Sequence, residues 1–154
     1  MRERAKPEFR SGYVHFQTMT TRWMDNDVYR HMNNTTYYSF FDTLVCQFLI
    51  ERGALDIEKS PVIGLVAQTT CRFFKSIAFP SKVNAGLRVG YQGNSSVRYE
   101  IGLFKDDENV ASAQGHFVHV YVDRESSRPV ALPETVRSAI LPLQMLMVQS
   151  AAAE

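Results

Sequence analysis

Residues 22–50 read RWMDNDVYRHMNNTTYYSFFDTLVCQFLI, and the change of pattern inside this stretch decides the fold. From Tyr37 to Leu49, large apolar residues recur at steps of three and four, which is typical of a helix with one wide apolar face. Asn33 and Asn34 suit the start of this helix, and Gly53 suits its end. A helix with so much apolar surface has to be covered on most sides, so the pattern predicts a central helix that packs against a sheet.

The rest of the chain supplies the strands of that sheet. Alternating apolar residues predict strands at 13–21, 82–93 and 95–106, and two further long segments, at 62–74 (rich in β-branched and aromatic residues) and at 110–123, are also predicted as strands. Short turns such as QGNSS and DDEN join the later strands, so we expect an antiparallel meander. Residues 132–147 predict a C-terminal helix with Pro133 in its first turn and Pro142 as a kink or break. The whole is an α+β fold with about five antiparallel strands wrapped around one long helix.

Composition places the chain among ordinary globular proteins with a single domain. It has 154 residues, of which 45% are hydrophobic and 21% charged, so we expect a flexible arm at 1–12 and one domain at 13–154. The net charge of +1 argues against a general nucleic-acid binder. The sequence shows neither a secretory signal nor the roughly 20 apolar residues of a membrane span. Cys46 and Cys71 have no metal-type spacing and fit buried thiols in a reducing compartment, so we expect a soluble, cytoplasmic protein.

The first half of the quoted stretch concentrates polar side chains immediately before the helix. Asp25, Asp27 and His31 lie in the expected loop, and the first turn of the helix offers free backbone N–H groups. Such a loop can bring a carboxylate close to an anion-binding helix terminus. Taken alone, both aspartates are more simply explained as residues that cap turns.

The same stretch carries a resemblance to a known family. In pattern and spacing it resembles the hotdog-fold acyl-CoA thioesterases of the 4-hydroxybenzoyl-CoA thioesterase-like group, whose fold is a long helix wrapped by an antiparallel sheet. The matching residues are Arg22, Trp23, Asp25, Asp27, His31, Met32, Asn33, Asn34 and Tyr37. Arg30 departs from the pattern, because the family usually has glycine before the histidine.

The resemblance implies a thioester hydrolase and a role for each residue of the site. Asp27 corresponds to the catalytic aspartate and is expected to act as base or nucleophile, whereas Asp25 is left as a structural residue. His31 is expected to orient water or the thioester, as the similar plant acyl-carrier-protein thioesterases have this histidine in the active site. The N–H of Asn34 or of a neighbouring residue is expected to bind the carbonyl oxygen.

Substrate contacts are also expected from the resemblance and from the chemistry of coenzyme A. Tyr37 is a candidate for the acyl tunnel, and Lys75 and Ser96 are candidates for contacts with the coenzyme A portion. Coenzyme A is then part of the substrate, and no separate cofactor or metal is expected. The identity of the acyl group, and coenzyme A versus an acyl-carrier protein as donor, stay open.

Other chemistries lack their sequence signals. His116 and His119 lie three apart in one strand, so they point to opposite faces and make no metal pair; satisfied or surface histidines are expected instead. The sequence contains no G-x-S-x-G, G-x-G-x-x-G or P-loop motif. The alternatives that stay open are a hotdog hydratase or dehydratase and a non-catalytic protein that binds acyl thioesters.

An oligomer is expected because one helix half-covered by one sheet leaves apolar surface unburied. Hotdog proteins pair two protomers so that their sheets join, and we therefore expect a homodimer or homotetramer.

Overall fold

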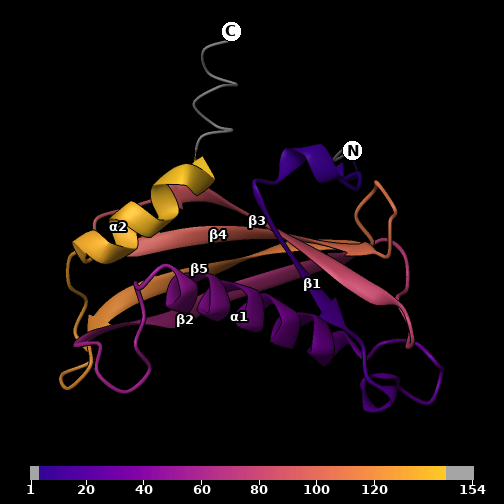
Figure 1. Ribbon diagram of the computed structural model, residues 1–154, viewed down its shortest axis with the longest axis horizontal. Coiled ribbons are helices and arrows are strands. Elements are labelled where there is room, and N and C mark those ends of the chain that lie inside the picture. The colour runs from indigo at the N-terminus through magenta and orange to yellow at the C-terminus, as the bar shows by residue number, and fades with distance from the viewer. Residues whose placement is uncertain (1–3, 145–154) are drawn as a thin grey trace, which may run out of the picture.

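The computed structural model describes residues 4–144, and its centre is a five-stranded antiparallel sheet with the order β1-β3-β4-β5-β2. Figure 1 shows the long helix α1 lying along one face of this sheet. The strands are β1 (His15–Thr20), β2 (Val62–Phe73), β3 (Lys82–Gln92), β4 (Ser96–Lys105) and β5 (Ala113–Asp123), and the helices are α1 (Asn34–Glu51) and α2 (Glu134–Ile140). The predicted α+β fold, with five strands around one helix, is confirmed.

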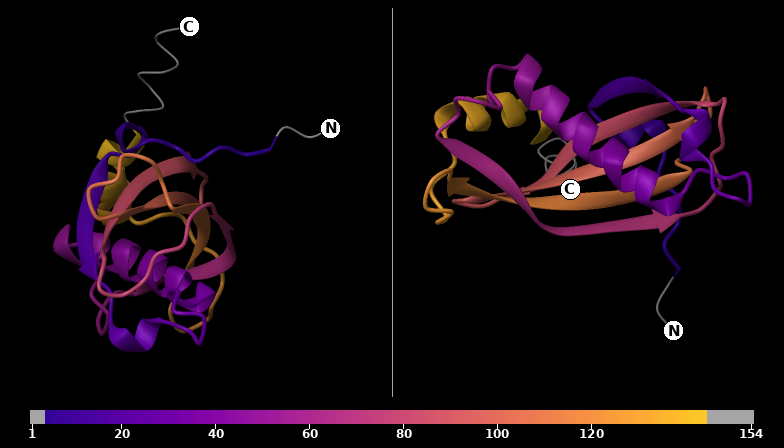
Figure 2. Two further views of the ribbon diagram at one scale, coloured as in Figure 1. Left: turned by 90° about the vertical axis from the view of Figure 1, so that its right-hand side faces the viewer. Right: turned by 90° about the horizontal axis from the view of Figure 1, so that it is seen from below.

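Helix α1 begins and ends at the residues that the sequence indicated. The side chain of Asn33 caps the helix by accepting the N–H of Thr35 at 3.0 Å. Gly53 follows the helix with φ +71°, a left-handed conformation that glycine adopts at little cost. Figure 2 shows the sheet curving over α1, whose apolar side chains are buried against it. The buried set is Tyr37, Phe41, Leu44, Val45, Phe48 and Leu49.

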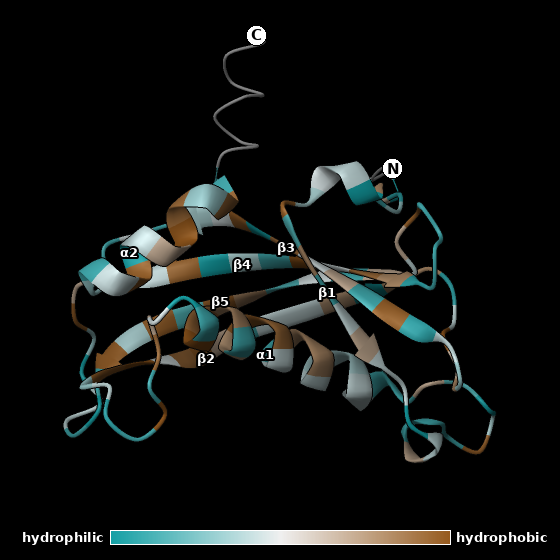
Figure 3. Cartoon of the chain, in the orientation of Figure 1, coloured by the Kyte–Doolittle hydropathy of each residue, from teal (hydrophilic) through white to brown (hydrophobic). Residues whose placement is uncertain are grey.

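On β3 and β4 the residues predicted to share one face are buried, with one exception. In Figure 3 the residues of β3 and β4 change between brown and teal along each strand, because successive side chains point to opposite faces. On β3, Val83, Ala85, Leu87 and Val89 are buried as expected. The prediction that Tyr91 shares this face was wrong: its side chain is 63% exposed, because the register between β3 and β4 shifts between Val89 and Tyr91.

The C-terminal helix breaks near Pro142, as the sequence indicated. Helix α2 ends at Ile140 and continues as one 3-10 turn, Leu141–Gln144, which contains Pro142. Proline lacks the N–H that the next helical turn needs, so the regular helix ends just before it. Residues 145–147 of the predicted helix lie outside the described residues. The buried residues of both segments join the same core as α1.

The two strand histidines point to opposite faces, as expected, but one of them is neither exposed nor satisfied. On the face away from α1, His116 contacts the hydroxyl of Thr70 through Nδ1 at 3.1 Å. His119 lies in the core with 4% exposure, and both of its ring nitrogens are buried without a partner among the described residues. Its neighbours include Tyr99 and Tyr121, whose hydroxyls bond to each other at 2.7 Å. Burial lowers the pKa of His119 from 6.5 to about 4.

The cysteines are less buried than expected. Cys46 and Cys71 are both free and half-buried. Burial raises the pKa of both thiols, to about 12 for Cys71, so both are kept protonated at neutral pH.

The segment before β1 is bonded to the sheet from Glu8 onward. The N–H of Ala111 donates to the carbonyl oxygen of Glu8 at 2.9 Å, and Phe9 forms an isolated bridge with Val110. The carboxylate of Glu8 pairs with Arg88 on β3 at 2.7 Å. No helix within residues 4–144 is long and apolar enough to cross a membrane.

Candidate functional site

The loop between β1 and α1 is braced by one of its two aspartates. Asp25 is 2% exposed and accepts the backbone N–H of Arg22 at 2.7 Å and its guanidinium at 2.9 Å. The carbonyl oxygen of Asp25 also accepts the N–H of Asn33, immediately before α1. Asp25 therefore fixes the path of the loop into the helix, in line with the structural role expected for it.

Arg30 adopts a backbone conformation that favours glycine. The loop reverses tightly here. The N–H of Asp27 donates to the carbonyl oxygen of His31 at 2.8 Å, and the N–H of Arg30 donates to the carbonyl oxygen of Asp27 at 3.0 Å. Closing this turn gives Arg30 a φ of +65°. A side chain in the left-handed region costs about 1–2 kcal/mol, which explains why the similar family usually has glycine at this position.

Asp27 is held so that one carboxylate oxygen is engaged and the other is free. Its Oδ1 accepts the backbone N–H of Tyr29 at 2.8 Å and that of His31 at 3.3 Å. Its Oδ2 has no hydrogen-bond partner among the described residues. Two backbone donors thus fix the direction of the carboxylate, and the free oxygen can take a proton or attack a carbon atom.

The start of α1, seven residues after Asp27, offers a free N–H group. The side chain of Asn33 accepts the N–H of Thr35, and its backbone carbonyl oxygen accepts the N–H of Thr36. The N–H of Asn34 has no partner within residues 4–144. Free N–H groups at a helix N-terminus, aided by the helix dipole, bind negatively charged oxygen.

A cavity of about 360 Å³ brings most of the predicted residues together. Asp27, Asn34, Tyr37 and Lys75 all line it. The ring of Tyr37 meets that of Phe73 edge to face at 4.9 Å, and its hydroxyl accepts the N–H of Ile77 at 3.4 Å. The cavity is therefore polar at the loop and aromatic on the side of β2.

Two predicted residues lie outside this cavity. The His31 side chain is exposed, and the residue serves the turn through its backbone N–H and carbonyl oxygen. Ser96 pairs with Val120, seven residues along β5 from the Ala113 that faces Phe73. At about 3.3 Å per residue, that separation is roughly 23 Å within one chain.

Three further residues line the cavity: Met32, Phe73 and Ser76. Met32 belongs to the motif before α1, and Phe73 and Ser76 belong to the RFFKS stretch at the end of β2, a region that the family resemblance also favours for substrate contacts. Met32 and Ser76 are brought in by the hydrogen bond from the N–H of Met32 to the carbonyl oxygen of Ile77 at 2.7 Å. This contact joins the loop to the β2–β3 connection, two segments far apart in sequence.

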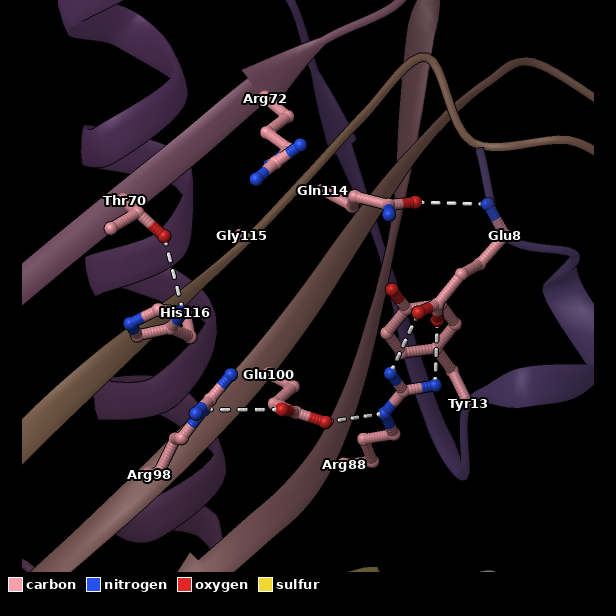
Figure 4. A pocket seen from close by; sticks show the side chains of 10 residues that line it. All are labelled: Glu8, Tyr13, Thr70, Arg72, Arg88, Arg98, Glu100, Gln114, Gly115 and His116. Atoms are coloured by element: carbon pink, nitrogen blue, oxygen red, sulfur yellow. Dashed lines mark hydrogen bonds and ion pairs between the residues drawn. The ribbon is translucent and has the colours of Figure 1, made fainter. Parts of the chain in front are cut away.

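A second cavity, of about 310 Å³, lies on the face of the sheet away from α1 (Figure 4). The strand register sets Arg88, Glu100, His116 and Thr70 side by side across β3, β4, β5 and β2. Arg88 bonds Glu100 at 2.8 Å, and Arg72 reaches over the sheet from the next position on this face of β2. Most of these charges are paired with one another. Within residues 4–144, no group of three or more His, Cys, Asp or Glu side chains is placed to hold a metal ion.

Comparison with known proteins gives consistent similarities. A sequence model of the thioesterase-like superfamily matches residues 21–140. The crystal structure of PA5185 from Pseudomonas aeruginosa strain PAO1 is 53% identical, with a TM-score of 0.87 over 89% of this chain and 96% of that one. The DHNA-CoA thioesterase of Staphylococcus aureus is 16% identical, with a TM-score of 0.75 over 90% of this chain and 94% of that one. The uncharacterised protein YsmA of Bacillus subtilis is 20% identical over 134 residues, 87% of this chain and 90% of its own length.

Proposed function

The chain belongs to the thioesterase-like superfamily, and from that premise we propose that it hydrolyses acyl-CoA to a free acid and coenzyme A. The observation that carries the proposal is the shared cavity of Asp27 and Asn34. It combines a carboxylate with one oxygen that is unbonded within residues 4–144 and a helix N-terminus whose first N–H is likewise unbonded in this part of the chain. Thioester hydrolysis needs both parts, one to activate water or attack the carbonyl carbon and one to stabilise the oxyanion.

In the proposed reaction, Asp27 acts first. Its free oxygen removes a proton from water, and the oxygen of that water adds to the thioester carbonyl carbon. The negative charge that forms on the carbonyl oxygen is held by the N–H of Asn34 and the dipole of α1. Collapse of the intermediate breaks the carbon–sulfur bond and releases coenzyme A as the thiolate. Direct attack by Asp27, followed by hydrolysis of the anhydride, uses the same geometry.

The neighbouring residues serve the substrate in this proposal. Tyr37 and Phe73 form the aromatic wall against which the acyl group packs. The amine of Lys75 lies 2.7 Å from the carboxylate of Glu108, so a phosphate group has to compete for it. His31 is proposed to orient water or the thioester through its exposed ring, while its backbone N–H and carbonyl oxygen hold the turn.

A homodimer is part of the proposal because β2 is an unprotected edge. Most of this strand is exposed, including Leu65 at 45% and Val66 at 47%. An exposed edge strand with apolar side chains favours pairing with another strand. Antiparallel pairing of two β2 strands would carry Ser96 of each copy toward the Asp27 cavity of the other, which gives Ser96 a route to the substrate despite its distance within one chain.

The test is a panel of acyl-CoA thioesters with short, long and aromatic acyl groups, incubated with the purified protein. A thioesterase releases free thiol and the free acid in equal amounts. A hydratase instead adds water to the acyl group and leaves the thioester bond intact. A binding protein releases no thiol and leaves the mass of the thioester unchanged. Absence of thiol release across the panel would refute the proposal, and the best substrate would identify the acyl class.

A further inference from the structure

The segment before β1 forms a basic cavity with the end of β2. This cavity, of about 680 Å³, is lined by residues 4–7 of the segment and by Arg72, Phe73 and Phe74. Arg4, Lys6 and Arg72 give it three positive charges, and none of its lining residues is acidic. Among the described residues, none of the three side chains forms an ion pair or a hydrogen bond.

The two other cavities described above differ from this one in charge. On the outer face of the sheet, Arg88 is bonded to both Glu8 and Glu100 (Figure 4). At the Asp27 cavity, Lys75 is paired with Glu108. The cations of residues 4–7 and β2 thus carry charge that no acidic side chain within residues 4–144 neutralises, which favours an anionic ligand.

The position of the basic segment is fixed by specific contacts. The side-chain amide of Gln114 on β5 accepts the N–H of Glu8 at 2.9 Å and donates to the carbonyl oxygen of Lys6 at 3.4 Å. Between them, Pro7 restricts the backbone. Figure 4 shows Gln114 reaching to Glu8, with Arg72 on the neighbouring strand. The backbone of Lys6 is therefore held at this end of the sheet, and its exposed side chain lines the same cavity as Arg72.

The basic cavity adjoins the Asp27 cavity directly. Phe73 and Phe74 line both of them. A ligand whose reactive group lies at Asp27 can therefore extend past these two rings to the three cations. A phosphopantetheine thioester has this layout, with an uncharged arm between the thioester and the phosphate groups.

We propose that Arg4, Lys6 and Arg72 bind the phosphate groups of the acyl-thioester substrate. This inference rests on the proposed function for the identity of the ligand. Arg4 and Lys6 lie outside the superfamily match, which begins at residue 21, so the family does not account for their part in the site; Arg72 lies inside the match. The segment before β1 is then a substrate-binding element of this chain.

The first test measures binding rather than hydrolysis. Calorimetry compares coenzyme A with pantetheine, which lacks the phosphates, on the wild type, Arg72→Gln and Lys6→Gln. Each substitution should weaken coenzyme A binding roughly tenfold or more, as expected for a lost charge-assisted contact, and leave pantetheine unaffected. The matched control is Arg128→Gln, which removes the same charge from an exposed loop beyond β5 and should change neither. Equal affinity for coenzyme A in all four proteins would overturn the proposal, as would an equal loss for pantetheine.

The second test separates this site from the reaction itself. Hydrolysis is measured with acyl-CoA, with an acyl-carrier-protein thioester, and with an S-acyl-N-acetylcysteamine thioester, which has no phosphate. The variants should raise KM for acyl-CoA and for the acyl-carrier-protein thioester, with the larger increase for whichever of the two is the natural donor. KM for the S-acyl-N-acetylcysteamine thioester should stay unchanged. If the wild type hydrolyses all three and the variants match it, the phosphate site is wrong and the thioesterase stands. If no donor is hydrolysed but the variants bind coenzyme A more weakly than the wild type, the phosphate site stands and the proposed thioesterase activity is wrong.

Discussion

Acidification should destabilise this protein through one buried histidine. The pKa of His119 is lowered from 6.5 to about 4 by burial, so the folded state holds the neutral ring. As the pH falls below 6.5, the unfolded chain binds a proton at this histidine, whereas the folded protein does not bind it until the pH approaches 4. The stability contributed by the neutral ring is full above pH 6.5, is lost progressively toward pH 4 and is gone below it. At 1.36 kcal/mol per pKa unit, the loss between pH 7 and pH 5 is about 2 kcal/mol, and the full loss is about 3 kcal/mol.

Urea unfolding at pH 7 and pH 5, at one fixed protein concentration, measures this loss. His119→Leu should remove about 2 kcal/mol of the difference between the two pH values, whatever its stability at pH 7. His116→Gln is the control from the opposite face of the same strand. Burial lowers the pKa of His116 too, but its side chain is only half-buried, so this variant should keep most of the acid sensitivity. The reasoning is refuted if His119→Leu is as sensitive to acid as the wild type.

Three further changes test the backbone and the core. Arg30→Gly should raise the free energy of unfolding by roughly 0.5–1 kcal/mol in urea titrations, because it relieves the positive φ; Val28→Gly, in the same loop without a positive φ, should lower it instead. Gly115→Ala should lower the melting temperature sharply, with a cost of about 3 kcal/mol, because the added Cβ would collide with the carbonyl oxygen of Thr70; a melting temperature equal to that of the wild type would contradict this packing. Tyr99→Phe should cost about 1–3 kcal/mol in chemical unfolding, since it leaves the buried hydroxyl on β5 without its partner; an unchanged midpoint would mean that this hydrogen bond contributes nothing.

The sequence predicted the fold well because its signals are local. The spacing of apolar residues from Tyr37 to Leu49 determines one face of α1, and the alternation in the later strands determines one face of the sheet. These periodicities survive in the folded protein because burial depends on them. The prediction failed at Tyr91, where an irregularity in pairing between β3 and β4 changes the register, since nothing local to β3 signals how β4 will pair.

The candidate site was predicted less completely because it joins distant segments. Asp27 and Asn34 could be found from one short motif, and they line the same cavity. Phe73 and Ser76 follow α1 by more than 20 residues and reach the cavity through the pairing of β2 with β5 and the brace at Ile77. Arg30 shows the converse case. The motif marked it as unusual, but only the closed turn reveals a positive φ as the physical reason.

His119 shows that residue type and alternation predict which face a side chain lies on but not whether its polar atoms find hydrogen-bond partners when buried. Its position three residues from His116 correctly placed it on the other face. Whether a buried ring finds a partner depends partly on side chains from other strands, such as Tyr99 on β4, whose identities no pattern local to β5 relates to it. Tyr99 and Tyr121 bond to each other, and the ring nitrogens of His119 have no partner within residues 4–144.

The central claim is that Asp27 performs the chemistry, and the most direct test is kcat for Asp27→Asn with the best acyl-CoA of the panel. The amide keeps the size of the side chain and the oxygen that accepts the N–H groups of Tyr29 and His31, so the melting temperature should stay close to that of the wild type. Loss of the base or nucleophile should lower kcat by roughly 100-fold to 10,000-fold. A folded Asp27→Asn variant that releases thiol at the wild-type rate would contradict the account.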